Sequence, residues 1–185
     1  MIPYTTERRA DTGVTNVRMG VWLFLASETM LFGAFFSAYA LLRSSALAWP
    51  AGREIVDLRV GVASAVVLLV IAALSTRVLL PQSFGRLVLV VGVLTAMFIG
   101  LQAAEYWSLM ARGLLPSASM FLAMYFTLTG IHTLHVIGGA VATICILARL
   151  SRVDPRLTAG RLQAMRMYWI FVFLTWLVIV ALVYL

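Results

Sequence analysis

The sequence of 185 residues contains no lysine, one cysteine and two histidines, and only 11% of its residues are charged. Soluble domains carry about a quarter charged residues and about 45–50% apolar ones, whereas this chain is 63% hydrophobic. The scarcity of charge therefore excludes an ordinary water-soluble domain. The lone Cys145 lies in an apolar run and has no second cysteine for an intrachain disulfide, so it does not indicate a redox compartment.

Five apolar stretches account for most of the sequence: 19–42, 60–80, 87–110, 119–148 and 168–185. Each is close to or above the roughly 20 residues that a membrane-spanning helix needs. Residues 1–18 are polar and lack the apolar core of a cleavable signal. The runs are too long and too continuously apolar for barrel strands, which alternate over about ten residues. We predict an all-α protein, a single domain over residues 1–185 folded as a bundle of five transmembrane helices.

The arginines divide unevenly between the two ends of such a bundle. With five spans the termini lie on opposite faces, and ten arginines share the N-terminal face: Arg8, Arg9, Arg18, Arg77, Arg86, Arg149, Arg152, Arg156, Arg161 and Arg166. The opposite face carries four: Arg43, Arg53, Arg59 and Arg112. Because arginine is enriched on the cytoplasmic side of membrane proteins, the count predicts a cytoplasmic N-terminus and a C-terminus on the outer face. Their position between apolar runs favours membrane orientation over nucleic-acid binding.

The chain lacks the motifs of a self-sufficient active site. It has no glycine-rich phosphate loop, no Gly-x-Ser-x-Gly elbow and no His-Glu-x-x-His pair. His132 and His135 are one turn apart on one helix, so they cannot approach a haem from opposite faces, and zinc or copper would require three or four ligands. We predict no catalytic residue, no metal site and no cofactor in this chain. It is expected to serve the chemistry of another subunit.

Three ionisable residues are predicted to lie near the middle of the membrane. Counting about 1.5 Å per residue along each helix, Glu28 lies about 4 Å from the midplane and His132 and His135 within about 3 Å of it. An unpaired ionisable group at this depth costs several kcal/mol. We therefore predict a buried carboxylate–histidine cluster in which Glu28 contacts His132 or His135. Glu28 is either a hydrogen-bonded acid that joins two helices or a titratable group coupled to proton movement in a neighbouring chain.

A second polar site is predicted around Glu105, about 10 Å to the outer side of the midplane. At this depth Glu105 is too far from the histidines, and its expected partners are Gln102, Tyr106 or the membrane interface. A carboxylate near a helix end can also reach water. The separation of about 14 Å between Glu28 and Glu105 argues against direct proton transfer between them.

Three segments resemble subunit III of the haem-copper terminal oxidases. Residues 23–32, LFLASETMLF, are similar to the apolar run of the family that carries its buried glutamate. Residues 101–106, LQAAEY, resemble its Leu-Gln-Ala-x-Glu-Tyr signature, and residues 126–139, FTLTGIHTLHVIGG, resemble its Thr-Gly-x-His-x-x-His-Val-x-x-Gly helix. The three occur in the order of the family. The number of spans matches its five-helix form.

One segment departs from the family pattern. The last helix of the family usually carries Trp-His-x-x-Asp-x-x-Trp, whereas this chain has Trp169 and Trp176 with Ile170 and Phe173 at the polar positions. This places a detailed transfer of residue roles at the fifth helix in doubt and indicates a divergent branch of the family.

The resemblance implies a non-catalytic core subunit of an aerobic oxidase in the bacterial plasma membrane, without a redox centre of its own. Haem and copper are expected in partner subunits, with subunit I packed against this chain, subunit II in the complex and a larger respiratory supercomplex as a further level. The resemblance also implies support of proton uptake, stability during turnover and bound phospholipid. We favour cytochrome c oxidase. The alternatives are an accessory subunit of a quinol oxidase or nitric oxide reductase and, from another class, an autonomous proton or ion carrier.

Overall fold

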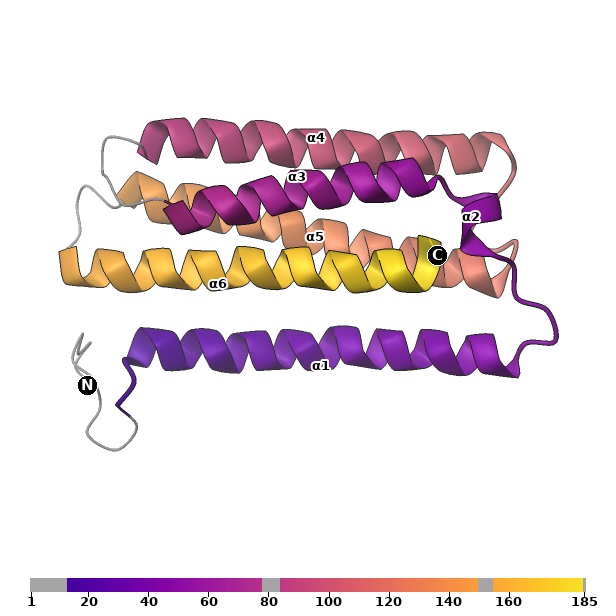
Figure 1. The fold of residues 1–185 in the computed structure, drawn as a ribbon, viewed down its shortest axis with the longest axis horizontal. Helices are drawn as coiled ribbons and strands as arrows, with labels where there is room; N and C mark the ends of the chain where they lie inside the picture. The colour runs from indigo at the N-terminus through magenta and orange to yellow at the C-terminus, as the bar shows by residue number, and fades with distance from the viewer. Residues whose placement is uncertain (1–12, 78–83, 150–154, 185) are drawn as a thin grey trace.

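The computed structural model describes residues 13–77, 84–149 and 155–184. Its long helices lie side by side (Figure 1), and they are α1 (Asn16–Ser45), α3 (Leu58–Arg77), α4 (Phe84–Ala111), α5 (Met120–Arg149) and α6 (Pro155–Ile179). A short helix, α2 (Gly52–Ile55), precedes α3, and a π-helical turn, η3 (Val180–Tyr184), continues α6. All five long helices are long and apolar enough to cross a membrane. The prediction of an all-α bundle with five spanning helices is confirmed.

The helix boundaries differ from the predicted ones chiefly at the fifth span. The fifth apolar run begins near residue 168, whereas helix α6 already begins at Pro155. Arg161 and Arg166 lower the local hydropathy without breaking the helix, and proline is tolerated at a first helical position because the N–H there would be unpaired. Helix α2 lies between the first two predicted spans, in a segment for which the sequence predicts a turn and no helix. Residues 1–12 of the polar N-terminal segment and 78–80 of the second predicted span lie outside the described residues.

Local signals explain where several helices begin and end. The Thr15 hydroxyl accepts the backbone N–H of Arg18 (3.4 Å) and caps the start of α1. At the end of α4, Gly113 adopts φ 74°, and the N–H of Leu114 bonds back to the Leu109 carbonyl (3.0 Å). This left-handed turn satisfies the last carbonyls of α4, so the chain reverses within a short loop into the antiparallel α5.

Helix α6 occupies the centre of the bundle. It contacts α1, α3 and α5, while α4 packs against α3 and α5 (Figure 1). Two indole groups anchor it: Trp169 donates to the Thr143 hydroxyl (3.0 Å) and Trp176 to the Gly61 carbonyl (3.0 Å). Helix α1 is peripheral, and only Phe32 and Tyr39 of its residues are buried. One flank of α1 is therefore open to lipid or to another chain.

Gly52 provides a sharp test of the packing at the C-terminal end of the bundle. A Cβ atom on Gly52 would overlap the backbone carbonyl of Val183 in η3, and a backbone group cannot move aside as a flexible side chain can. We expect Gly52→Ala to lower the free energy of unfolding by about 1–3 kcal/mol, measured as thermal or denaturant unfolding in detergent. The matched control is Gly100→Ala, because nothing lies within 4 Å of its added Cβ. Equal stability of the two variants would contradict the close approach of α2 and η3.

Candidate functional site

The structure brings Glu28 of α1 together with His135 of α5. The Oε2 atom of Glu28 lies 2.8 Å from Nε2 of His135, and the two side chains are only 15% and 16% exposed. Residues 16–45 and 120–148 are candidate membrane spans, and both residues lie well inside them. The pair therefore lies within the apolar part of the bundle, where a lone ionisable group would be costly. The sequence does not determine which of the two histidines contacts Glu28. In the structure it is His135.

The hydrogen bonds of His135 determine where its protons lie. Its Nδ1 atom is 2.8 Å from the carbonyl of Ile131, which can only accept, so Nδ1 carries a proton and donates it. A hydrogen bond between Nε2 and Glu28 then requires one further proton, held by either the imidazole or the carboxyl group. Both arrangements leave the pair with no net charge. The pair thus shares one proton and avoids the cost of an isolated charge in the membrane.

His132 takes no part in this pair. It is fully buried, and its Nε2–H donates to the carbonyl of Val172 in α6 (2.9 Å). Spacing by three residues places both histidines on nearly one face of α5, but that face is flanked by two helices: His132 reaches α6 and His135 reaches α1. The Phe32 ring contacts both, with centroid distances of 6.2 and 5.0 Å. Nδ1 of His132 has no hydrogen-bond partner among the described residues.

Tyr168 of α6 completes the surroundings of the pair and was not singled out from the sequence. Its hydroxyl donates to the backbone carbonyl of His135 (2.8 Å), and its ring lies 6.1 Å from that of Phe24. A tyrosine near a span end resembles an interfacial anchor, so its position in the sequence does not indicate this role. The tyrosine bonds α6 to α5 at the residue that binds Glu28.

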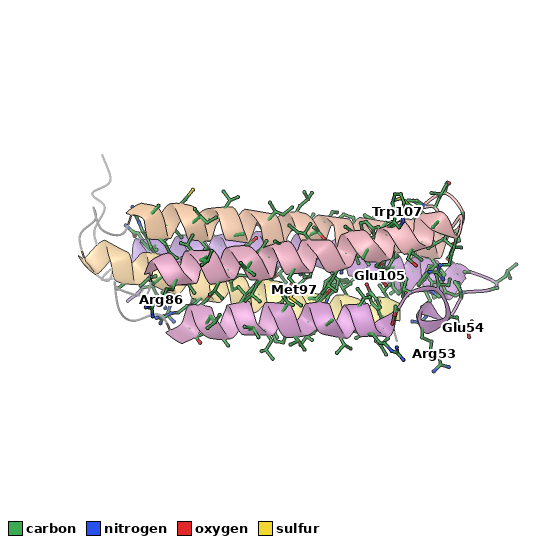
Figure 2. All side chains as sticks on the ribbon, turned by 90° about the horizontal axis from the view of Figure 1, so that it is seen from above. Arg53, Glu54, Arg86, Met97, Glu105 and Trp107 are labelled. Atoms are coloured by element: carbon green, nitrogen blue, oxygen red, sulfur yellow. The ribbon has the colours of Figure 1, made fainter. Side chains whose placement is uncertain are left out.

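Glu105 of α4 lies at the other polar position and is 5% exposed. Its Oε1 atom accepts the backbone N–H of Asp57 at the start of α3 (3.0 Å), and its Oε2 atom accepts the hydroxyl of Tyr184 in η3 (2.8 Å). The Tyr184 hydroxyl is also 3.3 Å from that of Tyr125. Glu105 bonds neither Gln102 nor Tyr106, the partners that depth suggested. It ties three segments together near the end of the bundle (Figure 2).

Gln102 and Tyr106 form their hydrogen bonds with other helices and not with Glu105. The amide of Gln102 donates to the Ser64 hydroxyl of α3 (3.4 Å). The Tyr106 hydroxyl is 2.6 Å from that of Thr129 in α5, and Thr129 gives its own proton to the Tyr125 carbonyl (2.7 Å), so Tyr106 is the donor. Glu105, Gln102 and Tyr106 are close in sequence but form hydrogen bonds with different segments, because α4 packs against both α3 and α5.

The described residues contain no group of three or more His, Cys, Asp or Glu side chains that could hold a metal ion. Cys145 is exposed on α5. What the two polar positions offer is hydrogen bonding between helices and, at Glu28 and His135, a shared proton.

Comparison with known proteins assigns the bundle to a family. The family model described as cytochrome c oxidase subunit III matches residues 6–185. The chain belongs to this family. The resemblance seen in residues 23–32, 101–106 and 126–139 is thereby confirmed, and the protein is a multi-pass membrane protein of the respiratory oxidases.

Individual relatives in the subunit III family come from more than one kind of oxidase. Cytochrome bo(3) ubiquinol oxidase subunit 3 of Pseudomonas aeruginosa is 31% identical over 182 residues, covering 95% of this chain and 87% of the relative. Cytochrome c oxidase subunit 3 of Bacillus sp. (strain PS3) is 28% identical over 190 residues, covering 99% and 92%. Heme-copper oxidase subunit I+III of Aeropyrum pernix is 31% identical over 184 residues, covering 92% of this chain and 23% of that longer protein.

The two apolar positions on α6 do not disturb its packing. Ile170 is 40% exposed and Phe173 is half-buried, while Trp169 and Trp176 on either side are fully buried and hydrogen-bonded. Helix α6 is therefore held by its tryptophans, without the polar residues that the family pattern places between them.

Proposed function

We propose that this chain is the non-catalytic core subunit III of an aerobic haem-copper oxidase, which packs on subunit I and supports proton uptake and turnover stability while oxygen is reduced to water. The match to subunit III over residues 6–185 carries the proposal. The neutral Glu28–His135 pair inside the bundle supports it. Haem and copper belong to the partner chains in this account.

The Aeropyrum pernix relative, whose name joins subunits I and III in one polypeptide, supports direct contact with subunit I. Two subunits that are joined in one polypeptide must be able to lie next to each other in one membrane. Helix α1 offers an unpartnered flank for such contact, with exposed side chains at Leu23, Met30 and Leu41. We propose contact with subunit II and membership of a larger respiratory assembly only on the family analogy.

The distribution of the arginines supports a proposal for the orientation and for lipid contacts. Arg86 lies at one end of the bundle and Arg53 at the other (Figure 2). We propose that the end with Arg86 is cytoplasmic, as the uneven arginine count favours, in a bacterial plasma membrane. Basic side chains at that interface would attract lipid phosphate.

Two electron donors fit the family. The Pseudomonas aeruginosa relative is named for a ubiquinol oxidase and the Bacillus relative for a cytochrome c oxidase, and each match covers at least 95% of this chain. We propose cytochrome c as the first donor to assay and quinol as the second. An autonomous carrier is disfavoured, because the described bonds of Glu28 and Glu105 lead to different helices and do not meet.

Purification of the tagged chain in a gentle detergent tests the proposal. The account predicts visible haem bands, co-purification of a subunit I chain, and oxygen reduction with one of the two donors. A colourless, homogeneous preparation that conducts protons in liposomes would overturn it in favour of the carrier. Mass identification of the co-purifying chains and separate assays with cytochrome c and quinol would assign the electron donor.

A further inference from the structure

Aromatic rings enclose the Glu28–His135 pair along the axis of the bundle. On the side toward the start of α1, the Tyr168 ring stacks on that of Phe24 (6.1 Å), which lies one helical turn before Glu28, and the Tyr168 hydroxyl donates to the His135 carbonyl (2.8 Å). The Tyr168 ring therefore spans the space between α1 and α5 at this level. On the other side of the pair, the Phe32 ring is buried and lies 5.0 Å from that of His135.

Gly139 allows the Tyr168 ring to pack directly on the backbone of α5. A Cβ atom on Gly139 would lie 2.6 Å from Cε1 of Tyr168, which is closer than two such carbon atoms can approach. Because the ring lies against the helix, its hydroxyl reaches the carbonyl of His135, one turn earlier in α5. The close packing and the hydrogen bond together fix the ring beside the pair.

An apolar pocket of about 250 Å³ lies between α1, α5 and α6 and is lined in part by Tyr168. Its other lining residues, which include Val21, Ala142 and Ala164, are nearer than the pair to the end of the bundle where α1 begins. The pocket opens to the surface of the bundle, because Phe24 and Ala142 in its lining are exposed. The Tyr168 ring is the barrier between this pocket and the pair.

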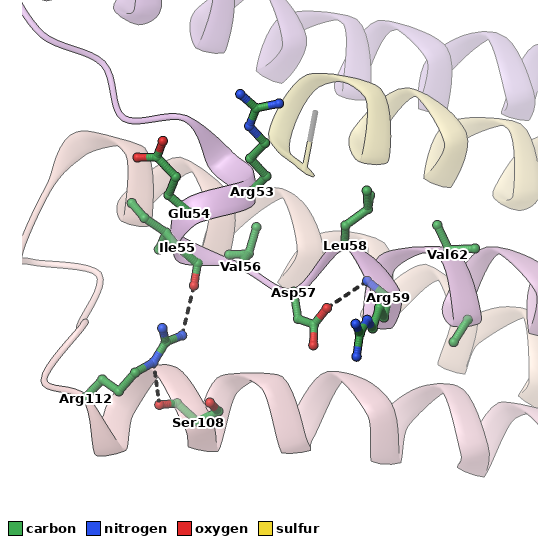
Figure 3. Close-up of a pocket in the computed structure, with 11 residues that line it drawn as sticks. Arg53, Glu54, Ile55, Val56, Asp57, Leu58, Arg59, Val62, Ser108 and Arg112 are labelled. Atoms are coloured by element: carbon green, nitrogen blue, oxygen red, sulfur yellow. Dashed lines mark hydrogen bonds between the residues drawn. The ribbon is translucent and has the colours of Figure 1, made fainter.

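The larger cleft at the opposite end of the bundle does not lead to the pair. It has a volume of about 920 Å³ and is lined by α2, the start of α3 and the end of α4, with Asp57 and Arg112 among its residues (Figure 3). The pair lies on α1 and α5, which contribute nothing to the lining of this cleft. The pocket beside Tyr168 is therefore the opening that adjoins the pair.

The remaining exposed surface of the pair faces sideways, toward the flank of the bundle. Both side chains are partly exposed although rings cover them along the axis. Within the described part of the chain, Oε1 of Glu28 forms no hydrogen bond, and it is not among the buried polar atoms that lack a partner. This oxygen is therefore at the surface of the bundle. Since the membrane offers only hydrocarbon at this depth, a neighbouring chain is the source of a polar group that can meet it.

We propose that Tyr168 is a positioning residue for the Glu28–His135 pair, which closes the route through the pocket and so prevents water from the end where α1 begins from exchanging with the shared proton. Tyr168 of α6 and His132 of α5 are the other titratable groups of the described chain that interact with the pair. With the route closed, the shared proton remains available to a neighbouring chain. This last consequence alone rests on the support of proton uptake given under the proposed function.

Infrared spectroscopy of the intact purified complex tests the role of Tyr168. The Glu28 band is the carboxyl or carboxylate absorption that Glu28→Gln removes, and the rate at which it shifts after transfer into D₂O gives the exchange rate of the shared proton. We expect exchange in Tyr168→Phe to be about fivefold faster than in the wild type, the equivalent of about 1 kcal/mol for the hydrogen bond that fixes the ring. Tyr168→Ala, which removes the ring itself, should exchange faster still.

The matched control is Tyr39→Phe. The Tyr39 hydroxyl also donates to a backbone carbonyl of another element, that of Leu182 in η3 (2.7 Å), and its side chain is buried. The substitution therefore removes the same kind of bond from the same bundle, but near the other end of α1. We expect the Glu28 band of Tyr39→Phe to exchange at the wild-type rate.

Two results would overturn the role of Tyr168. The first is equal exchange in the wild type and both Tyr168 variants, which would show that the ring does not control access to the pair. The second is equal acceleration in Tyr168→Phe and Tyr39→Phe, which would indicate a general loosening of the bundle. Haem content measured on the same samples tests the oxidase assignment separately, because that assignment predicts full haem content in every variant whatever the exchange rates are.

Discussion

Replacing Glu105 by leucine is expected to destabilise the protein by about 2–4 kcal/mol. The substitution keeps an apolar side chain of similar size but leaves the Tyr184 hydroxyl, which is fully buried, without the carboxylate that accepts its proton. A buried donor left unpaired costs about 1–3 kcal/mol, and the Asp57 N–H at the start of α3 loses its acceptor as well. The measurement is the free energy of unfolding of the purified protein in detergent.

Two comparisons isolate the Glu105 contact. Glu54→Leu makes the same change on an exposed acid at the same end of the bundle and is expected to leave stability nearly unchanged. Tyr184→Phe removes the other side of the bond, so the double variant with Glu105→Leu should lose less than the sum of the two single losses. Strict additivity of the two changes would contradict a direct contact between Glu105 and Tyr184.

Replacing Glu28 by alanine is expected to spare the first turnovers of the oxidase and to shorten its active life. The chain carries no redox centre in this account, so electron transfer in the partner subunit should begin at the wild-type rate. Loss of the carboxyl group leaves Nε2 of His135 without its partner inside the membrane, at a cost of about 1–3 kcal/mol. We expect weaker association with the catalytic subunit and a several-fold faster decline of oxygen consumption under continuous turnover.

The neighbouring substitution Ser27→Ala serves as the control for Glu28→Ala, because the Ser27 hydroxyl is exposed and, within the described part of the chain, bonds only the Phe24 carbonyl of its own helix (2.7 Å). It should match the wild type in both initial rate and endurance. An immediate and complete loss of haem reduction in Glu28→Ala would contradict a supporting role, since it would place Glu28 in the electron-transfer chemistry itself.

Depth along the helices predicts that Glu28 lies level with the two histidines of α5. Two spans of known direction and a fixed rise per residue bring Glu28 and His135 to the same level, and the cost of lone ionisable groups in lipid makes their pairing the expected outcome. The choice between His132 and His135 required the packing of α1 and α6 on either side of α5. No periodicity in one helix contains that information.

The partners of Glu105 could not be predicted, for two physical reasons. One donor is the backbone N–H of Asp57, and any residue at that position would supply the same group. The other donor, Tyr184, reaches Glu105 because α6 continues as a π-helical turn that packs beside α2. Hydropathy likewise did not indicate where helix α6 begins, because the helix extends through Arg161 and Arg166, before the apolar run starts.

The most direct test of the account is an experimental structure of the complex purified through this chain. The account predicts a haem-bearing subunit packed against the bundle and a Glu28 carboxyl group within hydrogen-bond distance of Nε2 of His135. A Glu28 side chain turned toward lipid with no polar neighbour, or a bundle that purifies with no haem-bearing companion, would contradict it.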